Sequence, residues 1–322
     1  MKRILIAGSL ALLASGVFAQ SVFAQTYPAR PIRILVGFAP GGAADVTARI
    51  LGEKYTAAMG VNVVVDNRTG ATGIIATDIV AKSAPDGYTL GLFALSFAIN
   101  PSIRKLPYDT ARDFTPITIT ATVPLVLVVT NSLPTRSVKE LIDLAKAKPN
   151  GLSVASSGVG SSPHLTAELF QLMTGTKMQN IAYKGSTQAH PDLIGGQVHL
   201  MFDTIVSTTP LIKAGRLRAL GVTSKGRAAE FPDVPAIGES VPGYESTSWG
   251  VLIAPAKVPP AIIEKLNKET VRALHLPDVK EKMARLGAEV VGNTTAEARK
   301  FLHDEVEKWA KTVKAAGITM EQ

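Results

Sequence analysis

The sequence of 322 residues predicts an α/β fold of two lobes with a ligand cleft between them. One arrangement occurs three times, a short β-type run followed by a glycine-rich loop and an amphipathic helix. These loops are 38–42, 67–73 and 157–163. Glycine lets a ligand approach closely, and unpaired backbone N–H groups at the positive end of a helix dipole favour an anion. Three such loops predict that a carboxylate-sized anion is held between the lobes.

The first lobe begins with alternating strands and helices. We expect strands at 32–36, 61–65 and 88–95 and helices at 43–58 and 73–83. Their spacing, roughly 28 residues from strand to strand, is typical of βαβ units in a parallel sheet. Apolar side chains recur three and four positions apart in the first of these helices, which predicts a buried face.

From about residue 123 the same alternation begins again. Ser137 is expected to cap the first helix of this second lobe, with Glu140 completing a capping box. The expected strands are 126–129, 152–156, 178–183, 198–203 and 217–223, and the expected helices are 138–148, 164–174, 187–195 and 208–214. A second α/β lobe is therefore predicted.

The last part of the chain, 249–322, opens with a strand and a proline-rich stretch and continues as three helices. The expected helices are 260–274, 278–286 and 295–315. These helices need a sheet to cover, and the first lobe is the one short of helices. We therefore expect the chain to return to the first lobe.

This return requires two crossings between the lobes, expected near 122–126 and 246–250. Residues 25–124 and 248–322 would then form the first lobe, and residues 125–247 the second. Two crossings make a hinge and are typical of the type II-like arrangement of two-lobed binding proteins. Their ligand lies in the cleft, where it meets the carboxyl ends of strands and the N-termini of helices.

The first residues predict export. Lys2 and Arg3 precede an apolar run, 4–17, and two small-residue cleavage motifs follow, as in a secretory signal peptide. We expect cleavage after Ala24, with Ala19 as the alternative. The apolar run is shorter than the ~20 residues that a membrane span needs, which disfavours a retained anchor.

The composition excludes several classes of protein. The chain has no cysteine, which rules out a lipid-anchored N-terminal cysteine, disulfides and thiolate metal sites. The formal net charge of +8 falls to +6 when Lys2 and Arg3 leave with the signal peptide. That charge suits an anionic ligand, but it is spread along the chain, so no nucleic-acid binding is expected. The histidines are scattered, so neither a metal nor a cofactor is expected.

The glycine-rich loops do not match nucleotide-binding motifs. No P-loop pattern occurs, and Gly158-Val159-Gly160 lacks the third glycine of the dinucleotide motif. Asp45 lies in the first turn of its helix, where a carboxylate complements the dipole and caps loop N–H groups. The alternative is contact with a ligand ammonium group. Arg49, one turn later, is expected to pair with Asp45.

Ser161, Ser162, His164 and Asp203 raise the possibility of a secreted serine hydrolase. Ser162 and His164 are two residues apart at a helix start and cannot readily face each other, and the Gly-x-Ser-x-Gly elbow is absent. His164 is therefore expected to orient a loop or to donate to an anion. A plain helix-start role is the alternative.

Other residues are expected beside the cleft. Tyr183-Lys184-Gly185 ends a strand of the second lobe, and Lys184 is a candidate partner for a distal carboxylate. Phe38 is expected to form an apolar wall, and Ser96 to donate from the end of the third strand. A solvated lysine is an equal alternative for Lys184, and packing or turn roles are equal alternatives for Phe38 and Ser96.

Six segments of the chain together form a specific pattern: 27–45 (YPARPIRILVGFAPGGAAD), 66–73 (DNRTGATG), 84–90 (APDGYTL), 161–165 (SSPHL), 183–185 (YKG) and 195–203 (GGQVHLMFD). With these segments the chain resembles Bug-type receptors, the solute-binding components of tripartite tricarboxylate transporters. The resemblance covers the whole mature chain. It implies a periplasmic receptor whose two α/β lobes, the periplasmic binding protein fold, close on a small carboxylate.

The resemblance also implies which residues hold the ligand. One carboxylate would lie against the first two loops, at Pro40, Gly41, Gly42, Gly70, Ala71, Thr72 and Gly73. Selectivity would come from Phe38, Ser96, Ser157, Gly160, Ser161, His164, Tyr183, Gly185 and Asp203. Many relatives carry a Thr or Ser before the Asp of the first loop, whereas this chain has Ala43 and Ala44. A plain organic acid is therefore favoured over an amino-dicarboxylate.

We therefore expect a non-catalytic, monomeric receptor in the periplasm that presents a small carboxylate to a membrane permease of the tripartite tricarboxylate type. A sensory role, in which the ligand signal passes to a membrane histidine kinase, is the alternative within the same class. The serine hydrolase is the alternative from a different class. The expectation extends to small carboxylates as a class and not to one particular acid.

Overall fold

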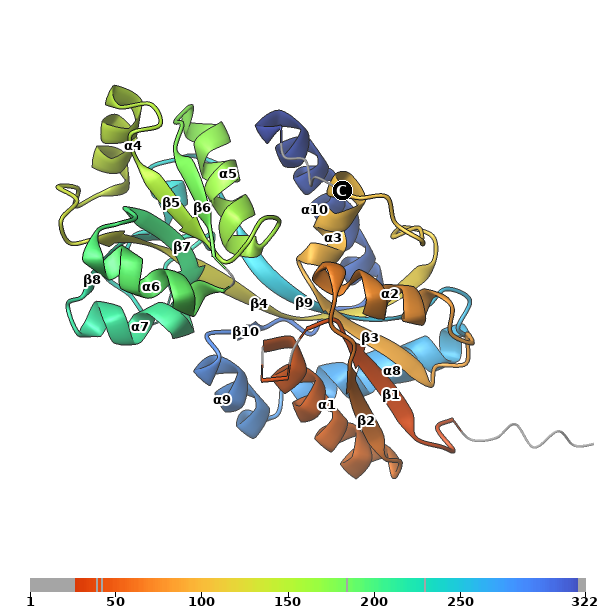
Figure 1. Cartoon of the computed structure of the whole chain (residues 1–322). Coiled ribbons are helices and arrows are strands. Elements are labelled where there is room, and N and C mark those ends of the chain that lie inside the picture. The colour runs from red at the N-terminus through yellow and green to blue at the C-terminus, as the bar shows by residue number, and fades with distance from the viewer. Residues whose placement is uncertain (1–26, 39, 42, 184, 229, 318–322) are drawn as a thin grey trace, which may run out of the picture.

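A computed structural model describes residues 27–317 apart from 39, 42, 184 and 229. The expected signal peptide and both cleavage sites lie outside the described residues. Figure 1 shows two groups of helices and strands on either side of a pair of long strands, β4 (Phe114–Thr130) and β9 (Thr247–Pro255). The predicted two-lobed α/β class is confirmed. Within the described residues, no helix combines the length and the apolar character that crossing a membrane requires.

The first half of the sheet has the order β2-β1-β3-β9-β4. Its parallel strands are β1 (Ile32–Val36), β2 (Val63–Asn67) and β3 (Thr89–Ala94). Its helices are α1 (Ala43–Met59), α2 (Ile74–Ala81), α3 (Ser96–Ile103), α8 (Pro260–Leu274), α9 (Pro277–Arg285) and α10 (Thr295–Ala316), with a 3-10 turn at Ala71–Gly73 and a short strand β10 (Glu289–Val290). Successive side chains of β1 enter different cores, since Ile34 packs with α1 and α8 and Leu35 with α2, α3 and α10.

The second half continues from β4 in the order β4-β7-β5-β6, and β8 also pairs with β4. Its elements are α4 (Val138–Ala147), β5 (Ser153–Ser156), α5 (Ser162–Thr174), β6 (Gln179–Ala182), α6 (Ser186–Gly195), β7 (Leu200–Thr204), α7 (Ile205–Lys213) and β8 (Leu217–Val222). Side chains again alternate, because Leu127 packs with α4 and α5 while Val128 packs with α6 and α7. Ser137 caps α4 as predicted, accepting a hydrogen bond from the Glu140 N–H at 3.2 Å.

Strand β4 joins the two halves. It pairs with β9 as far as Pro124 and with β7 from Leu125 onward. The sequence predicted only its last part, 126–129, because Pro116 and Pro124 interrupt the preceding segment. The chain passes back into the first half at β9. We propose the lobe boundaries 124/125 and 247/248 on the strength of this change of pairing.

Two further elements, α3 and β10, were not predicted. Helix α3 contains Pro101, and its N-cap residue is Leu95, whose side chain cannot cap it, so the usual start and stop signals are missing. Strand β10 has two residues. Strand β2 was predicted two residues too early.

Helix α10 packs against both halves, on α3 of the first and α5 of the second. It is tied to β9 by Glu305, which is 7% exposed. One oxygen of Glu305, Oε2, accepts the indole N–H of Trp249 at 2.7 Å and that of Trp309 at 3.0 Å. A single buried carboxylate thus satisfies both tryptophans of the chain.

Glu305→Ala leaves two buried indole N–H groups without an acceptor. We expect the free energy of unfolding to fall by about 2–4 kcal/mol, measured by urea denaturation followed by circular dichroism. The matched control is Glu307→Ala on the exposed side of the same helix, for which we expect a change below about 0.5 kcal/mol. Equal stability of Glu305→Ala and the control would contradict this role.

Candidate functional site

The loops predicted to hold a ligand follow the carboxyl ends of the parallel strands in both halves. Strands β1, β2 and β3 lead into α1, α2 and α3, and strands β5, β6 and β7 lead into α5, α6 and α7. A Cβ added to Gly160, in the loop after β5, would lie 3.3 Å from Ile103 at the end of α3. The loop after β5 therefore meets the end of α3 in the other half, and loops at the carboxyl ends of strands are where α/β proteins typically bind ligands.

The first two loops pack directly on each other. A Cβ on Gly37 would lie 2.6 Å from the Cα of Gly73, so glycine is required for this approach. The half-buried Phe38 ring lies beside Gly73 and packs on the core between β1 and α1. The structure thus brings together Phe38 and residues 70–73, which the sequence placed in one site.

Asp45 braces the first loop. Its carboxylate is 2% exposed and accepts the Gly41 N–H at 2.9 Å, Nε and Nη2 of Arg49 at 3.0 Å each and Nδ2 of Asn67 at 3.0 Å. Asn67 also donates to the Phe38 carbonyl at 3.0 Å. The predicted pairing of Arg49 with Asp45 is confirmed.

This network uses the acceptor positions of the Asp45 carboxylate on protein groups. The hydrogen bond from Arg49 lowers the pKa of Asp45 to about 2. We therefore assign Asp45 to bracing the loop rather than to contact with a ligand ammonium. Sequence reasoning missed Asn67 as its partner, although Asn67 ends a strand next to a glycine-rich loop.

The glycine amides were expected to be unpaired, and for three of them this is wrong. The N–H of Gly41 donates to Asp45, that of Gly73 to the Gly70 carbonyl at 3.0 Å and that of Gly160 to Nδ1 of His164 at 3.1 Å. These glycines supply positive φ angles of 86°, 91° and 78° and so shape the loops. Helix geometry leaves the first-turn amides of α1, at Ala43 and Ala44, without helical partners. Gly42 lies outside the described residues.

His164 orients the loop before α5. Its ring is 5% exposed, and burial lowers its pKa, which keeps it neutral. Because Nδ1 accepts the Gly160 N–H, the proton lies on Nε2, which faces Oε1 of Glu168 at 3.6 Å. Ser161 instead caps α5 by accepting the His164 N–H at 3.4 Å, and Ser162 donates to Ser248 at 3.4 Å. The ring of His164 therefore bonds neither serine hydroxyl, and the hydrolase arrangement is not formed.

Asp203 is a second buried brace. It is 1% exposed and accepts the hydroxyls of Ser186 at 2.8 Å and Ser207 at 2.7 Å and the Thr204 N–H at 2.8 Å. His190 Nε2 lies 2.8 Å from Oδ2 of Asp203, the oxygen that also accepts the Ser207 hydroxyl. Asp203 thus fixes the starts of α6 and α7 at the end of β7. No pattern in the sequence pointed to His190 as a partner of Asp203.

The remaining predicted residues lie around the same loops. Tyr183 donates to Asp192 at 2.7 Å, and burial raises its pKa to about 12. Gly185 caps α6 with a φ of 145°, Ser96 begins α3, and Ser157 is half-buried in the loop after β5. Pro40 is exposed next to Gly41. Lys184 lies outside the described residues. No cluster of three or more His, Asp or Glu side chains suited to a metal occurs among those described.

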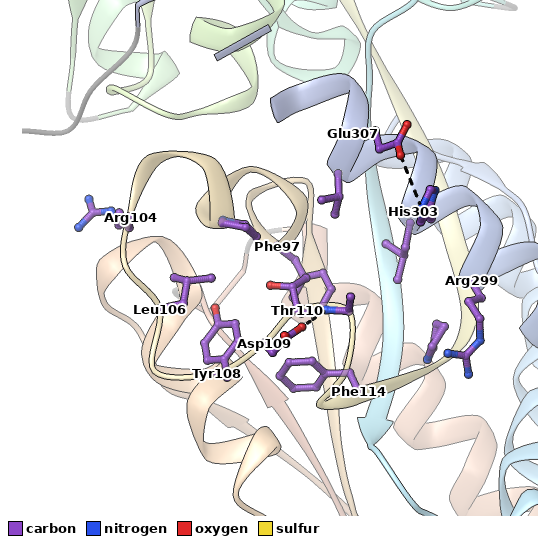
Figure 2. A pocket seen from close by; sticks show the side chains of 15 residues that line it. Phe97, Arg104, Leu106, Tyr108, Asp109, Thr110, Phe114, Arg299, His303 and Glu307 are labelled. Carbon is purple, nitrogen blue, oxygen red and sulfur yellow. Dashed lines mark hydrogen bonds and ion pairs between the residues drawn. The ribbon is translucent and has the colours of Figure 1, made fainter. Parts of the chain in front are cut away.

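A cavity of about 720 Å³ lies apart from these loops, between α3, the segment 104–116 and α10. Figure 2 shows Phe97, Tyr108 and Phe114 in this cavity, with Arg104 and Arg299 at opposite sides. A smaller cavity of about 60 Å³ lies at the start of α1, where it meets β4 and β9. Volume alone would favour the former, but the latter is lined by Ala43 and Ala44, the first residues of α1, and a helix N-terminus suits an anion.

Comparisons with known proteins identify relatives along the whole chain. A family model described as the tripartite tricarboxylate transporter family receptor matches residues 47–318. Protein BugT of Bordetella pertussis is 39% identical over 328 residues, which cover 100% of this chain and 99% of BugT.

Two solved structures are also similar. Rpa4515 of Rhodopseudomonas palustris, solved with adipate, is 36% identical with a TM-score of 0.79 and covers 91% of this chain and 100% of its own. MatC from Rhodopseudomonas palustris with bound malate is 29% identical with a TM-score of 0.75 and covers 89% of this chain and 100% of its own.

The pH dependence of stability tests the role of Asp45. The pKa of Asp45 is about 2 in the folded protein and 3.8 ordinarily. The ionised carboxylate therefore stabilises the fold above about pH 4, and this contribution is lost as the pH falls through 2. Asp45→Asn should lower the free energy of unfolding by about 1–2 kcal/mol at pH 6. Solvent screens the charge of the half-exposed Arg49, which makes this loss smaller than the pKa shift alone implies.

We expect this difference between wild type and Asp45→Asn to shrink between about pH 4 and 2 in urea titrations. The exposed control Asp143→Asn should change stability by less than about 0.5 kcal/mol. A difference that is independent of pH would show that Asp45 does not act through its charge.

Proposed function

Because this chain belongs to the tripartite tricarboxylate transporter receptor family, we propose that it captures a small carboxylate in the periplasm and delivers it to a membrane permease. The permease would be of the tripartite tricarboxylate type. Export would depend on the N-terminal signal peptide, cleaved after Ala24. The lobes would close on the ligand by bending at β4 and β9, the two strands through which the chain passes between them.

The observation that carries this proposal is the braced start of α1 beside the 70–73 loop. Asp45 and Asn67 hold the first loop in place, and Gly37 lets the second loop pack against it. The first-turn amides of α1 then supply N–H donors at the positive end of a helix dipole. Such a site would bind the carboxylate of any acid, because its N–H groups recognise the charge and shape of the carboxylate and not the remainder of the ligand.

The rest of the ligand would be selected across the cleft. Residues at the starts of α3, α5 and α6 are the candidates: Ser96, Ser157, Gly160, Ser161, His164, Tyr183 and Gly185. Phe38 would supply an apolar wall. The relatives solved with adipate and with malate support a dicarboxylate, and the two alanines before Asp45 favour an acid without an amino group.

Thermal unfolding of the mature protein, from Gln25 onward, tests the proposal. The protein is unfolded and refolded to remove retained ligand and is then heated with adipate, malate, citrate, benzoate or aspartate. A ligand at 100 times its Kd should add roughly 2.7 kcal/mol to the free energy of unfolding. We expect adipate or malate to raise the Tm more than benzoate or aspartate. A Tm that no carboxylate changes would contradict the proposal.

His164→Ala separates the receptor from a hydrolase. Because His164 accepts the Gly160 N–H and so orients this loop, we expect the variant to bind the dicarboxylate several-fold more weakly, as measured by calorimetry. Cleavage of a simple nitrophenyl ester should proceed at the same background rate in wild type and variant. An ester-cleavage rate that depends on His164 would favour the hydrolase.

A further inference from the structure

We propose that Asn100 is a positioning residue for ligand binding, which holds the 70–73 loop in a left-handed backbone conformation that suits a bound carboxylate. The inference rests on the proposed function of this loop. It also identifies a residue of α3, a helix that the sequence did not predict, as part of the binding machinery.

The loop has an unusual backbone. Four consecutive residues have positive φ angles: Gly70 at 132°, Ala71 at 45°, Thr72 at 53° and Gly73 at 91°. Glycine adopts such angles freely, whereas alanine and the β-branched threonine are strained in them. Strained residues of this kind persist only where their surroundings hold them, and they gather at ligand-binding sites.

Asn100 supplies a two-point contact to the strained residue. Its Nδ2 donates to the Thr72 carbonyl at 3.3 Å, and its Oδ1 accepts from the Thr72 hydroxyl at 3.0 Å. The same hydroxyl also lies 2.7 Å from the Ala71 carbonyl, so its single hydrogen is shared between two acceptors. Asn100 thus holds both the main chain and the side chain of Thr72 by hydrogen bonds.

The base of this contact is rigid. Asn100 is 2% exposed, and its neighbours Phe97 and Ile99 are buried in the core shared by both halves. Three residues further along α3, Ile103 lies against Gly160 of the second half. Asn100 therefore connects the strained loop to the helix that meets the loop of the opposite lobe. Without it, Thr72 would relax toward an ordinary φ, and the amides of Ala71 and Thr72 would change direction.

A double-mutant cycle tests this with adipate as the probe, measured by calorimetry. Asn100→Ala should weaken binding about tenfold. Thr72→Gly introduces a residue that adopts a positive φ without strain, so the loop no longer needs Asn100 to hold it. In the Thr72→Gly background Asn100→Ala should therefore weaken binding less than about threefold. Thr72→Val keeps the shape, removes the hydroxyl and leaves Asn100 intact, and should weaken binding several-fold. Equal effects of Asn100→Ala in both backgrounds would overturn the proposal.

Hydrogen exchange of the ligand-free protein gives a readout that does not depend on the proposed function. Asn100→Ala should speed exchange of the amides at 71–74 selectively, whereas the matched control Ser102→Ala on the same helix should not. If Asn100→Ala fails to fold, Thr72→Val should still speed exchange in this loop. Unchanged exchange overturns the inference. If adipate and malate fail to bind wild type while exchange responds as expected, the proposed function fails and the positioning role of Asn100 stands.

Discussion

The hydrogen-bond network of the Asp45 carboxylate is the constraint on which the candidate site depends. It joins the loop after β1, the first turn of α1 and the end of β2 in one buried contact. Its negative charge would itself occupy the favourable potential at the start of α1, but the bidentate contact with Arg49 neutralises it. The helix dipole and the first-turn amides are therefore left for an external anion. We propose that Asp45 in this way prepares the start of α1 to bind a ligand carboxylate.

The second half also contains a buried carboxylate that braces its loops, but with different hydrogen-bond partners. Asp203 is buried at the end of β7, and the serine hydroxyls of α6 and α7 together with His190 satisfy its oxygens. Burial of a carboxylate is costly unless such partners surround it. Because the partners of each carboxylate lie in its own half, the loops at the ends of β1 and β7 are held in shape without a ligand. Preorganised donors of this kind favour binding by reducing its entropic cost.

The sequence predicted most strands and helices because their apolar spacing and caps are regular, as at Ser137. It failed where a single element serves both lobes or lacks a start signal. The first part of β4 is interrupted by Pro116 and Pro124, and α3 contains Pro101 and lacks a capping side chain. Loop positions followed from the glycines, but hydrogen-bond partners did not, since Asn67 and Asn100 lie 22 and 28 residues along the chain from Asp45 and Thr72. Contacts between distant residues leave no pattern in one sequence.

The central claim is that the braced loops of the first half hold a ligand carboxylate, rather than the cavity between α3 and α10. A crystal structure of the mature protein grown with adipate tests it most directly. We predict one carboxylate within hydrogen-bond distance of the first-turn amides of α1 and of the 70–73 loop, with the remainder of the acid against residues at the starts of α5 and α6. Adipate bound instead among Phe97, Phe114 and Arg299 would contradict the account.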